Sequence, residues 1–291
     1  MGIRVLYIGE IVGKAGVYCV KNALPRIKES REIDFVIANG EGATGGFGLG
    51  KNHSIYLRKL GIDVITGGEK IYYKKDMVPH IAKSSYILRP ANYPPGNPGR
   101  GWRTYPVGER KVGVISMLGQ SGFSRVHLSN PFTFLPELVS RIKEETGIII
   151  LDFHAATTAE KYSMFHHADG MVSAVIGSHG KVLTADEHIK AKGTAVICDT
   201  GRTGSFMSVG GLDPKVEIEK FTTQIPERSN ETWDTLELQG VIIDINTDGT
   251  AKSIERLRWP VENMQDSPEG EKQNKRNKND ERGWSYTKDR G

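Results

Sequence analysis

Two histidines, His154 and His179, each follow a short apolar run of the sequence. The runs Ile148–Leu151 and Met171–Ile176 are rich in β-branched residues and bounded by glycine or polar residues, which is typical of buried parallel strands. The segment Thr157–Ala168 between them fits a crossover helix with a threonine at its N-cap. A strand–helix–strand unit would bring the two imidazoles together at the carboxyl ends of neighbouring strands, where open α/β sheets bind ligands.

Three glutamates follow further predicted strands in the same way. Glu10, Glu41 and Glu69 come shortly after the apolar runs that begin at Arg4, Ile33 and Asp63. Together with the two histidines they give five potential ligands, which we expect on one edge of one sheet. Carboxylates and imidazoles suit zinc, manganese or iron. The alternative for the histidines is that hydrogen bonds at the strand ends simply satisfy them.

The elements that must position these residues alternate between strands and helices, so the sequence predicts an α/β protein. Helical patterns run over Gly13–Ser30, Asn52–Leu60, Phe134–Glu145 and Pro214–Phe221, and a strand pair flanks the turn at Asn246–Gly249. The glycine-rich loop at 43–50 lacks the lysine spacing of a nucleotide P-loop.

Composition limits the class of protein. The chain has 291 residues, is 37% hydrophobic, carries a net charge of +4 and has two cysteines, which we expect to be buried thiols. No apolar run reaches the length that spans a bilayer, and no signal peptide is evident at the N-terminus, so we expect no membrane partner and a cytoplasmic location. The net charge is too small to indicate a nucleic-acid-binding protein by itself.

The composition changes near the C-terminus. Residues 1–262 fit one domain, whereas 263–291 contain almost no apolar residues and predict a disordered polar tail. The basic cluster Lys272–Lys278 could contact RNA or an acidic partner, but such a run is more often only solvated.

Several stretches resemble the bacterial YmdB-type metallophosphoesterases of the calcineurin-like superfamily. They are Asn39–Glu41 (NGE), Arg89–Asn92 (RPAN), Asp152–Ala155 (DFHA), Thr184–Asp186 (TAD) and Gly193–Ala195 (GTA). The resemblance covers Arg4 to about Trp259. It implies a four-layer αββα metallophosphoesterase sandwich, a dinuclear metal centre at the strand tips, and hydrolysis of phosphodiesters such as 2′,3′-cyclic nucleotides.

The chain departs from the family pattern at the site itself. Glu10 stands where the family has Asp, and Gly42 where it has Asn. Gly68 and Glu69 replace an Asn-His pair whose histidine is the family's general acid, and Ala156 replaces a carboxylate. Lys181 takes the place of the second metal-ligand histidine in the His-x-His tip. The resemblance therefore leaves Glu41, His154 and His179 as metal ligands, with Glu10 a weaker candidate because its side chain is longer.

These departures predict a depleted metal centre. A protonated lysine cannot ligate a metal ion, and it repels a divalent cation at close range. We therefore expect at most one divalent ion (iron, manganese or zinc), or none. The main expectation is little or no hydrolase activity and a role in binding or scaffolding, with a protein or nucleotide partner and a homo-oligomeric state. The alternative is an active phosphodiesterase with a rebuilt one-metal site, in which Glu69 or Lys181 takes a new role.

Overall fold

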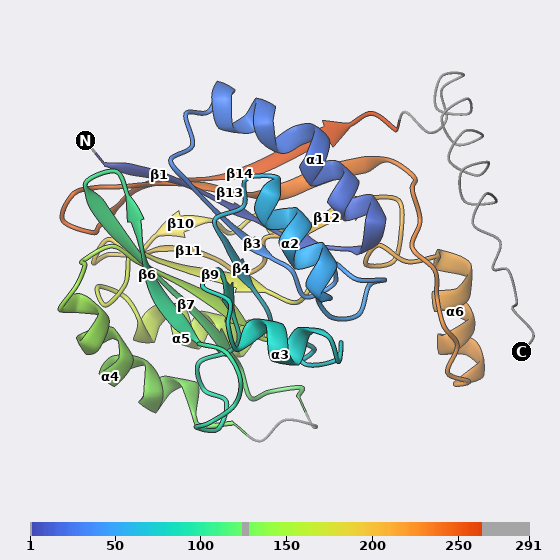
Figure 1. The fold of residues 1–291 in the computed structure, drawn as a ribbon, viewed down its shortest axis with the longest axis horizontal. Helices are drawn as coiled ribbons and strands as arrows, with labels where there is room; N and C mark the ends of the chain where they lie inside the picture. The colour runs from blue at the N-terminus through green and yellow to red at the C-terminus, as the bar shows by residue number, and fades with distance from the viewer. Residues whose placement is uncertain (1, 124–127, 264–291) are drawn as a thin grey trace, which may run out of the picture. The chain divides into compact units, whose positions relative to one another are not determined.

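The computed structural model describes residues 2–123 and 128–263, and two β-sheets stand at the centre of this part of the chain (Figure 1). The larger sheet has eight strands in the order β2-β12-β13-β1-β3-β4-β5, with β14 paired to β13, and the smaller has the order β10-β11-β9-β8-β7-β6. The strands of the larger sheet are β1 (Ile3–Ile8), β2 (Glu10–Ile11), β3 (Phe35–Asn39), β4 (Val64–Thr66), β5 (Ile87–Leu88), β12 (Arg202–Ser205), β13 (Leu236–Ile245) and β14 (Ala251–Val261). Those of the smaller sheet are β6 (Trp102–Val107), β7 (Arg110–Leu118), β8 (Ile149–His154), β9 (Ala174–Ser178), β10 (His188–Ile189) and β11 (Ala195–Ile197).

Helices cover the outer face of each sheet. The helices are α1 (Gly13–Ser30), α2 (Lys51–Lys59), α3 (Met77–Ile81), α4 (Pro131–Lys143), α5 (Thr158–His167) and α6 (Pro214–Thr223). Buried side chains of α1, α2 and α3 pack with those of β1 and β3, and those of α4 and α5 pack with β7 and β8. Figure 1 shows α1 and α2 on one side of the paired sheets and α4 and α5 on the other.

A third apolar cluster lies between the two sheets. Val5 and Ile37 of the larger sheet pack in it with Val114, Ile150 and Ile176 of the smaller one, and all five are fully buried. Burial of large aliphatic side chains is the main favourable contribution to folding. The four-layer αββα sandwich expected from the sequence is therefore confirmed.

Local sequence explains where the helices next to the smaller sheet begin. Asn130 caps α4 by accepting a hydrogen bond from the Phe132 amide, and Pro131 occupies the first helical position. Thr157 caps α5 in the same way, through the amide of Glu160. The predicted N-cap of α5 is thus confirmed.

The structure corrects two expectations about these elements. The five candidate ligands do not share one sheet edge: Glu10, Glu41 and Glu69 follow strands of the larger sheet, and His154 and His179 belong to the smaller. The short strands β2 and β12 were not predicted, because two to four residues carry no readable periodicity.

Three other expectations concern burial, membrane spans and the tail. Cys19 and Cys198 are buried free thiols, as expected. Among the residues with assigned positions, no helix is both long and apolar enough to cross a bilayer. Residues 264–291, including the basic cluster Lys272–Lys278, lie outside the described residues, so the expected tail stays a prediction.

Candidate metal centre

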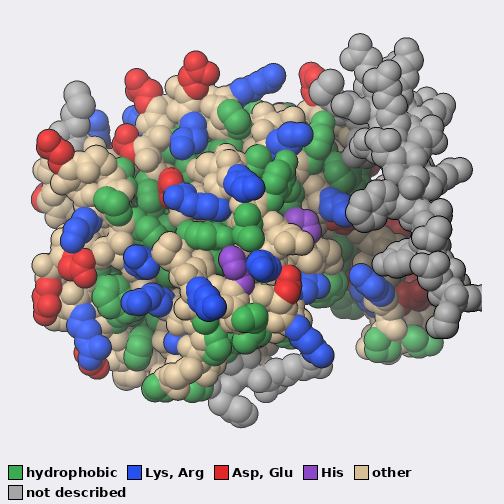
Figure 2. Space-filling view, in the orientation of Figure 1, with side chains coloured by type: hydrophobic (Ala, Val, Ile, Leu, Met, Phe, Trp, Pro, Cys, Tyr) green, Lys and Arg blue, Asp and Glu red, His purple; other side chains and the backbone are tan. Residues whose placement is uncertain are grey.

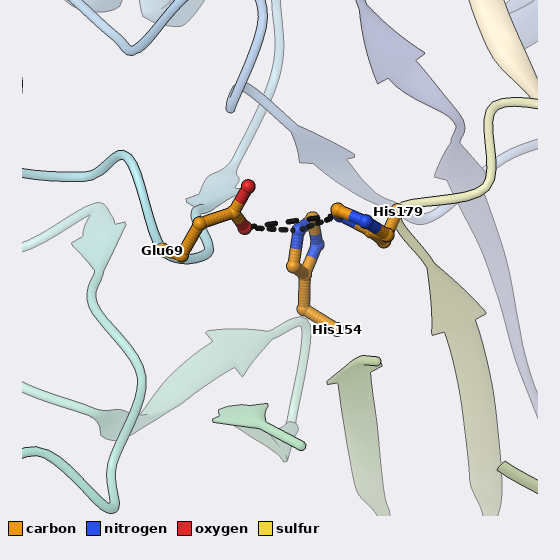
Figure 3. A group of neighbouring side chains, drawn as sticks. All are labelled: Glu69, His154 and His179. Carbon is orange, nitrogen blue, oxygen red and sulfur yellow. Dashed lines mark hydrogen bonds and ion pairs between the residues drawn. The ribbon is translucent and has the colours of Figure 1, made fainter. Parts of the chain in front are cut away.

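Three potential metal ligands converge where the two sheets meet. His154 is the last residue of β8, His179 follows β9, and Glu69 follows β4 (Figure 3). The Nε2 of His154 lies 2.9 Å from Oε2 of Glu69 and 3.1 Å from Nδ1 of His179. The Glu69 oxygen is 3.8 Å from His179 Nδ1. Because β8 and β9 pair in parallel, their ends bring the two imidazoles together as the sequence predicted.

Hydrogen bonds fix the orientation of the His154 ring. The hydroxyl of Ser178 donates its hydrogen to Asp152 (2.7 Å), so its oxygen is left to accept from His154 Nδ1 at 2.9 Å. The protonated Nδ1 leaves Nε2 as the atom that faces Glu69 and His179. Hydrogen-bond partners on the nitrogen that does not face the metal set the tautomer of metal-binding histidines.

The tip that carries His179 is held in a rare backbone conformation. His179 has φ 100° and Lys181 has φ 59°, values that non-glycine residues seldom adopt. Asp199 accepts a hydrogen bond from the Gly180 amide (2.6 Å) and pairs with the ammonium of Lys161 at 2.9 Å. Both side chains of this ion pair are 4% exposed. The buried Lys161–Asp199 ion pair thus holds the tip through the Gly180 amide.

Neighbouring charges and burial shift the pKa values of Glu69, His154 and His179. Burial lowers the pKa of His154, but the hydrogen bond that Glu69 accepts from it and the nearby carboxylate charges outweigh this effect, so that pKa is raised. Burial acts to raise the pKa of Glu69, yet His154 and Lys70 hold it well below its usual range. Burial and the charge of His154 lower the pKa of His179 to about 4. These shifts favour the charged forms of Glu69 and His154 and the neutral form of His179.

Glu10 faces Lys181 in place of a metal ion. Glu10 is 1% exposed, and the Lys181 ammonium lies 3.2 Å from its Oε1. Neither Glu10 oxygen has a partner with hydrogen-bond geometry, so the contact is an ion pair only. The resemblance places Lys181 at a metal-ligand position of the family, and in the structure its ammonium lies against Glu10.

Glu41 is tied to the loop that carries Glu69. One of its oxygens accepts from the Gly68 amide at 2.6 Å, and the other accepts from the Lys70 amide. Burial is the main cause that raises the pKa of Glu41 to about 7. Among the described residues, ligand atoms of Glu69, His154 and His179 all lie within 4.8 Å of one another. Glu41 and Glu10 are not part of this group. The ligand roles expected for Glu41 and Glu10 stay predictions.

Two glycines leave room for this arrangement. A Cβ on Gly42 would lie 2.7 Å from Oε1 of Glu10. A Cβ on Gly68 would lie 2.4 Å from Cδ2 of His154. Glycine at position 42 therefore leaves the space that the longer Glu10 side chain occupies, and glycine at position 68 leaves the space for the His154 ring.

Sequence reasoning missed two residues that border the centre. Lys70 pairs with Oε1 of Glu69 at 2.7 Å, and its place directly after Glu69 at a strand tip could have indicated this. Phe123 lies against both imidazoles, with ring centroids 6.1 Å from His154 and 5.0 Å from His179. Phe123 comes from a loop with no pattern that would have placed it there.

The three-residue group fits one divalent metal ion. Ligand atoms about 2.0–2.1 Å from a tetrahedral ion lie roughly 3.3 Å apart, and the three separations here are 2.9, 3.1 and 3.8 Å. Two imidazoles and one carboxylate form a ligand set that zinc, manganese and iron all accept.

Comparisons with known proteins identify the family and agree with the fold. The model of the YmdB-like protein family matches residues 6–257. The 2′,3′-cyclic-nucleotide 2′-phosphodiesterase of Bacillus subtilis is 36% identical over 252 residues, which cover 87% of this chain and 94% of that protein. The crystal structure of a novel phosphatase from Mycoplasma pneumoniae has 30% identity and a TM-score of 0.85, and the match covers 95% of this chain and 99% of that one.

A more distant match shows the fold alone. The NAD nucleotidase of Haemophilus influenzae is 12% identical with a TM-score of 0.59, and covers 89% of this chain and 56% of that one. None of these proteins supports the expectation of inactivity, since the curated Bacillus protein is named for a phosphodiesterase activity. The comparisons favour the alternative drawn from the sequence over its main expectation.

Proposed function

Because this chain belongs to the YmdB-like protein family, we propose that it is a phosphodiesterase that works with one divalent metal ion held by Glu69, His154 and His179. Its proposed substrates are 2′,3′-cyclic nucleotides or related phosphodiesters, the class named for the Bacillus subtilis relative. The observation that carries the proposal is the convergence of these three ligand atoms at the end of the paired sheets. When bound, a divalent ion there would polarise the phosphoryl group and activate water.

The two lysines at the site suit an anionic substrate. Lys70 lies against Glu69, and Lys181 lies against Glu10. Burial acts to lower the pKa of Lys70, but the carboxylates of Glu69, Glu10 and Glu41 outweigh it, so Lys70 stays an ammonium at neutral pH. We propose that both ammonium groups attract the phosphodiester and offset the negative charge that develops during cleavage.

Protonation of the leaving group is the weak point of this site. Glu69 replaces the histidine that the sequence analysis identified as the family's general acid, and its lowered pKa keeps it ionised at neutral pH. We therefore propose Glu69 as a metal ligand and not as a proton donor. A substrate whose leaving group needs no proton should then be cleaved faster than one with an alkoxide leaving group.

This proposal is tested by comparing two substrates after the metal content has been measured. Elemental analysis of purified protein should give at most one iron, manganese or zinc per chain. With Mn²⁺ added, bis(p-nitrophenyl) phosphate should be hydrolysed faster than 2′,3′-cyclic AMP, because p-nitrophenolate leaves without protonation. His154→Ala and His179→Ala should each reduce the rate at least a hundredfold, whereas His166→Ala, an exposed histidine of α5, should not.

Several results would contradict the proposal. Two tightly held metal ions per chain would show a dinuclear centre. Full activity in excess chelator, or equal activity of the His179→Ala variant and the parent, would exclude the assigned ligands.

A second candidate function rests on the ion pair between Lys181 and Glu10. The Lys181 ammonium already neutralises Glu10, so this candidate is a site that binds a phosphate ester without hydrolysing it. This candidate predicts that the metal-free protein binds 2′,3′-cyclic AMP and leaves it intact. Binding that requires added metal would exclude it.

A further inference from the structure

A second basic pocket lies beside the edge strand β6, formed by residues other than the metal ligands. It encloses about 510 Å³ between the segment Arg89–Arg103, helix α4 and Glu145. Three arginines line it, namely Arg89, Arg100 and Arg103. Figure 2 shows Lys and Arg side chains across the middle of the face that carries β6, α2 and α3, with few acidic side chains among them.

The three arginines lack acidic partners. In the described ranges 2–123 and 128–263, no ion pair is formed by any of them. Arg89 is 91% buried, since its relative exposure is 9%. Its Nη1 donates to the Pro90 carbonyl at 2.7 Å, while its Nε has no partner. A buried guanidinium with an unused donor is costly unless something accepts from it.

The carboxylate at the pocket does not neutralise this charge. Glu145 accepts a hydrogen bond from Thr104 at 2.7 Å and pairs with Lys111 at 3.3 Å. Lys111 therefore neutralises much of the charge of Glu145. The three arginines give the pocket a net positive charge. Guanidinium groups bind phosphate oxygens through two parallel hydrogen bonds, so the three arginines suit an anionic phosphate group.

Aromatic side chains form another part of the wall. Trp102 and Phe134 line the pocket and are half-buried, so each keeps some ring surface exposed. An exposed aromatic face beside arginines is the arrangement on which a nucleobase stacks while its phosphate is held. A volume of about 510 Å³ falls within the usual range for pockets that hold one small ligand.

We propose that this pocket binds a nucleoside monophosphate, with the phosphate on the three arginines and the base against Trp102. The proposal does not depend on hydrolysis at the metal centre. None of the residues that line the pocket belongs to the group of Glu69, His154 and His179.

Calorimetric titration with 5′-AMP, adenosine and inorganic phosphate tests the proposal. The parent protein should bind 5′-AMP more tightly than either adenosine or phosphate, with an affinity that falls as salt is raised. The double variant R100Q/R103Q, which changes two exposed side chains, should weaken 5′-AMP binding at least tenfold. Trp102→Leu should weaken 5′-AMP binding and leave phosphate binding unchanged.

Two controls separate this pocket from other sites. Arg26→Gln, a change at an exposed arginine of α1, should bind 5′-AMP as the parent does. His179→Ala should also retain binding, which would show that the nucleotide is not held at the metal centre. The proposal is overturned if the parent does not bind 5′-AMP, if R100Q/R103Q binds it unchanged, or if His179→Ala abolishes binding. Equal affinity for 5′-AMP and phosphate would overturn the role given to Trp102.

Discussion

At the scale of single residues, the ammonium of Lys181 provides the positive charge that a buried Glu10 needs. Glu10 is almost fully buried with no hydrogen bond to either oxygen, and its contact with Lys181 is an ion pair at 3.2 Å. Burying a carboxylate without a counter-charge is strongly unfavourable. In metal-free protein, this single lysine therefore contributes to the stability of the fold.

Replacing Lys181 with alanine tests this charge balance. We expect Lys181→Ala to lower the free energy of unfolding in chelator by about 3 kcal/mol, the usual cost of leaving a buried charge unpaired. Urea denaturation of the parent and the variant measures the difference.

The matched control removes the carboxylate as well. The double variant Lys181→Ala/Glu10→Gln should recover most of the lost stability, because no buried charge remains. Parent-like unfolding of Lys181→Ala in chelator would show that the ion pair is not needed.

Sequence reasoning identified most residues of the site but not all of their contacts. Glu10, His154, His179 and Lys181 could be found because each stands at or just after the end of a predicted strand. That Glu69, and not Glu10 or Glu41, is the carboxylate beside the imidazoles could not be predicted, because it depends on how the loop after β4 approaches the end of β8 across two sheets. A one-dimensional pattern carries no information on that distance.

At the scale of elements, the loop after the His179 tip is anchored by Asp186. Its carboxylate accepts from the Cys198 amide at 3.2 Å and from the Tyr162 hydroxyl at 2.7 Å. These contacts join the loop to the end of β11 and to α5. Burial acts to raise the pKa of Asp186, but these hydrogen bonds and one with Thr184 hold it below its usual value.

A lowered pKa makes this anchor depend on pH. The folded-state pKa lies below the unfolded value of about 3.9, so the stabilisation is fully present above that pH and is lost as pH falls through the folded-state pKa. We expect Asp186→Asn to melt below the parent by the same margin at pH 7 and pH 5, with the gap closing as the pH falls below about 3.9. Thermal melts at pH 7, 5 and 3.5 measure it.

Tyr162→Phe serves as a partial control, since it removes one of these hydrogen bonds and should give a smaller gap with the same pH trend. A gap for Asp186→Asn that is equal at all three pH values would mean that the ionised carboxylate is not what holds the loop.

The elements were predicted better than their assembly. The helices α1 and α5 and most strands fall within a few residues of the predicted ranges, because burial on one face imposes a readable periodicity. The sequence also predicts a helix after Lys70 that ends near Lys83, and the structure has only Met77–Ile81 there. The division of the strands into two sheets was implied by the resemblance and not by the pattern, since buried strands of either sheet read alike.

At the scale of the whole molecule, the apolar clusters of the described residues extend as far as the end of β14. The apolar clusters that hold the four layers involve residues up to Val261, at the end of β14. The composition from Asn263 onward offers little apolar surface to offset the entropy of ordering. We expect a chain ending at Glu262 to melt within about 1 °C of the full-length protein in calorimetry.

A melting temperature lowered by several degrees in the shortened chain would show that the C-terminal segment packs on the domain. The same pair of proteins tests the expected RNA contact, because loss of Lys272–Lys278 should then weaken RNA binding in a gel-shift assay. The homo-oligomeric state expected from the sequence stays a prediction, which sedimentation of either protein would check.

Gly68 also constrains the order in which this site could have changed during evolution. A Cβ at that position would lie 2.4 and 2.5 Å from Cδ2 and Nε2 of His154, a buried ring that Ser178 holds in place. Return of the family asparagine at position 68 is therefore blocked while His154 stays where it is, however few nucleotide changes it needs. Reversal would require the imidazole to move first, so a change at position 68 alone does not lead back to the family arrangement.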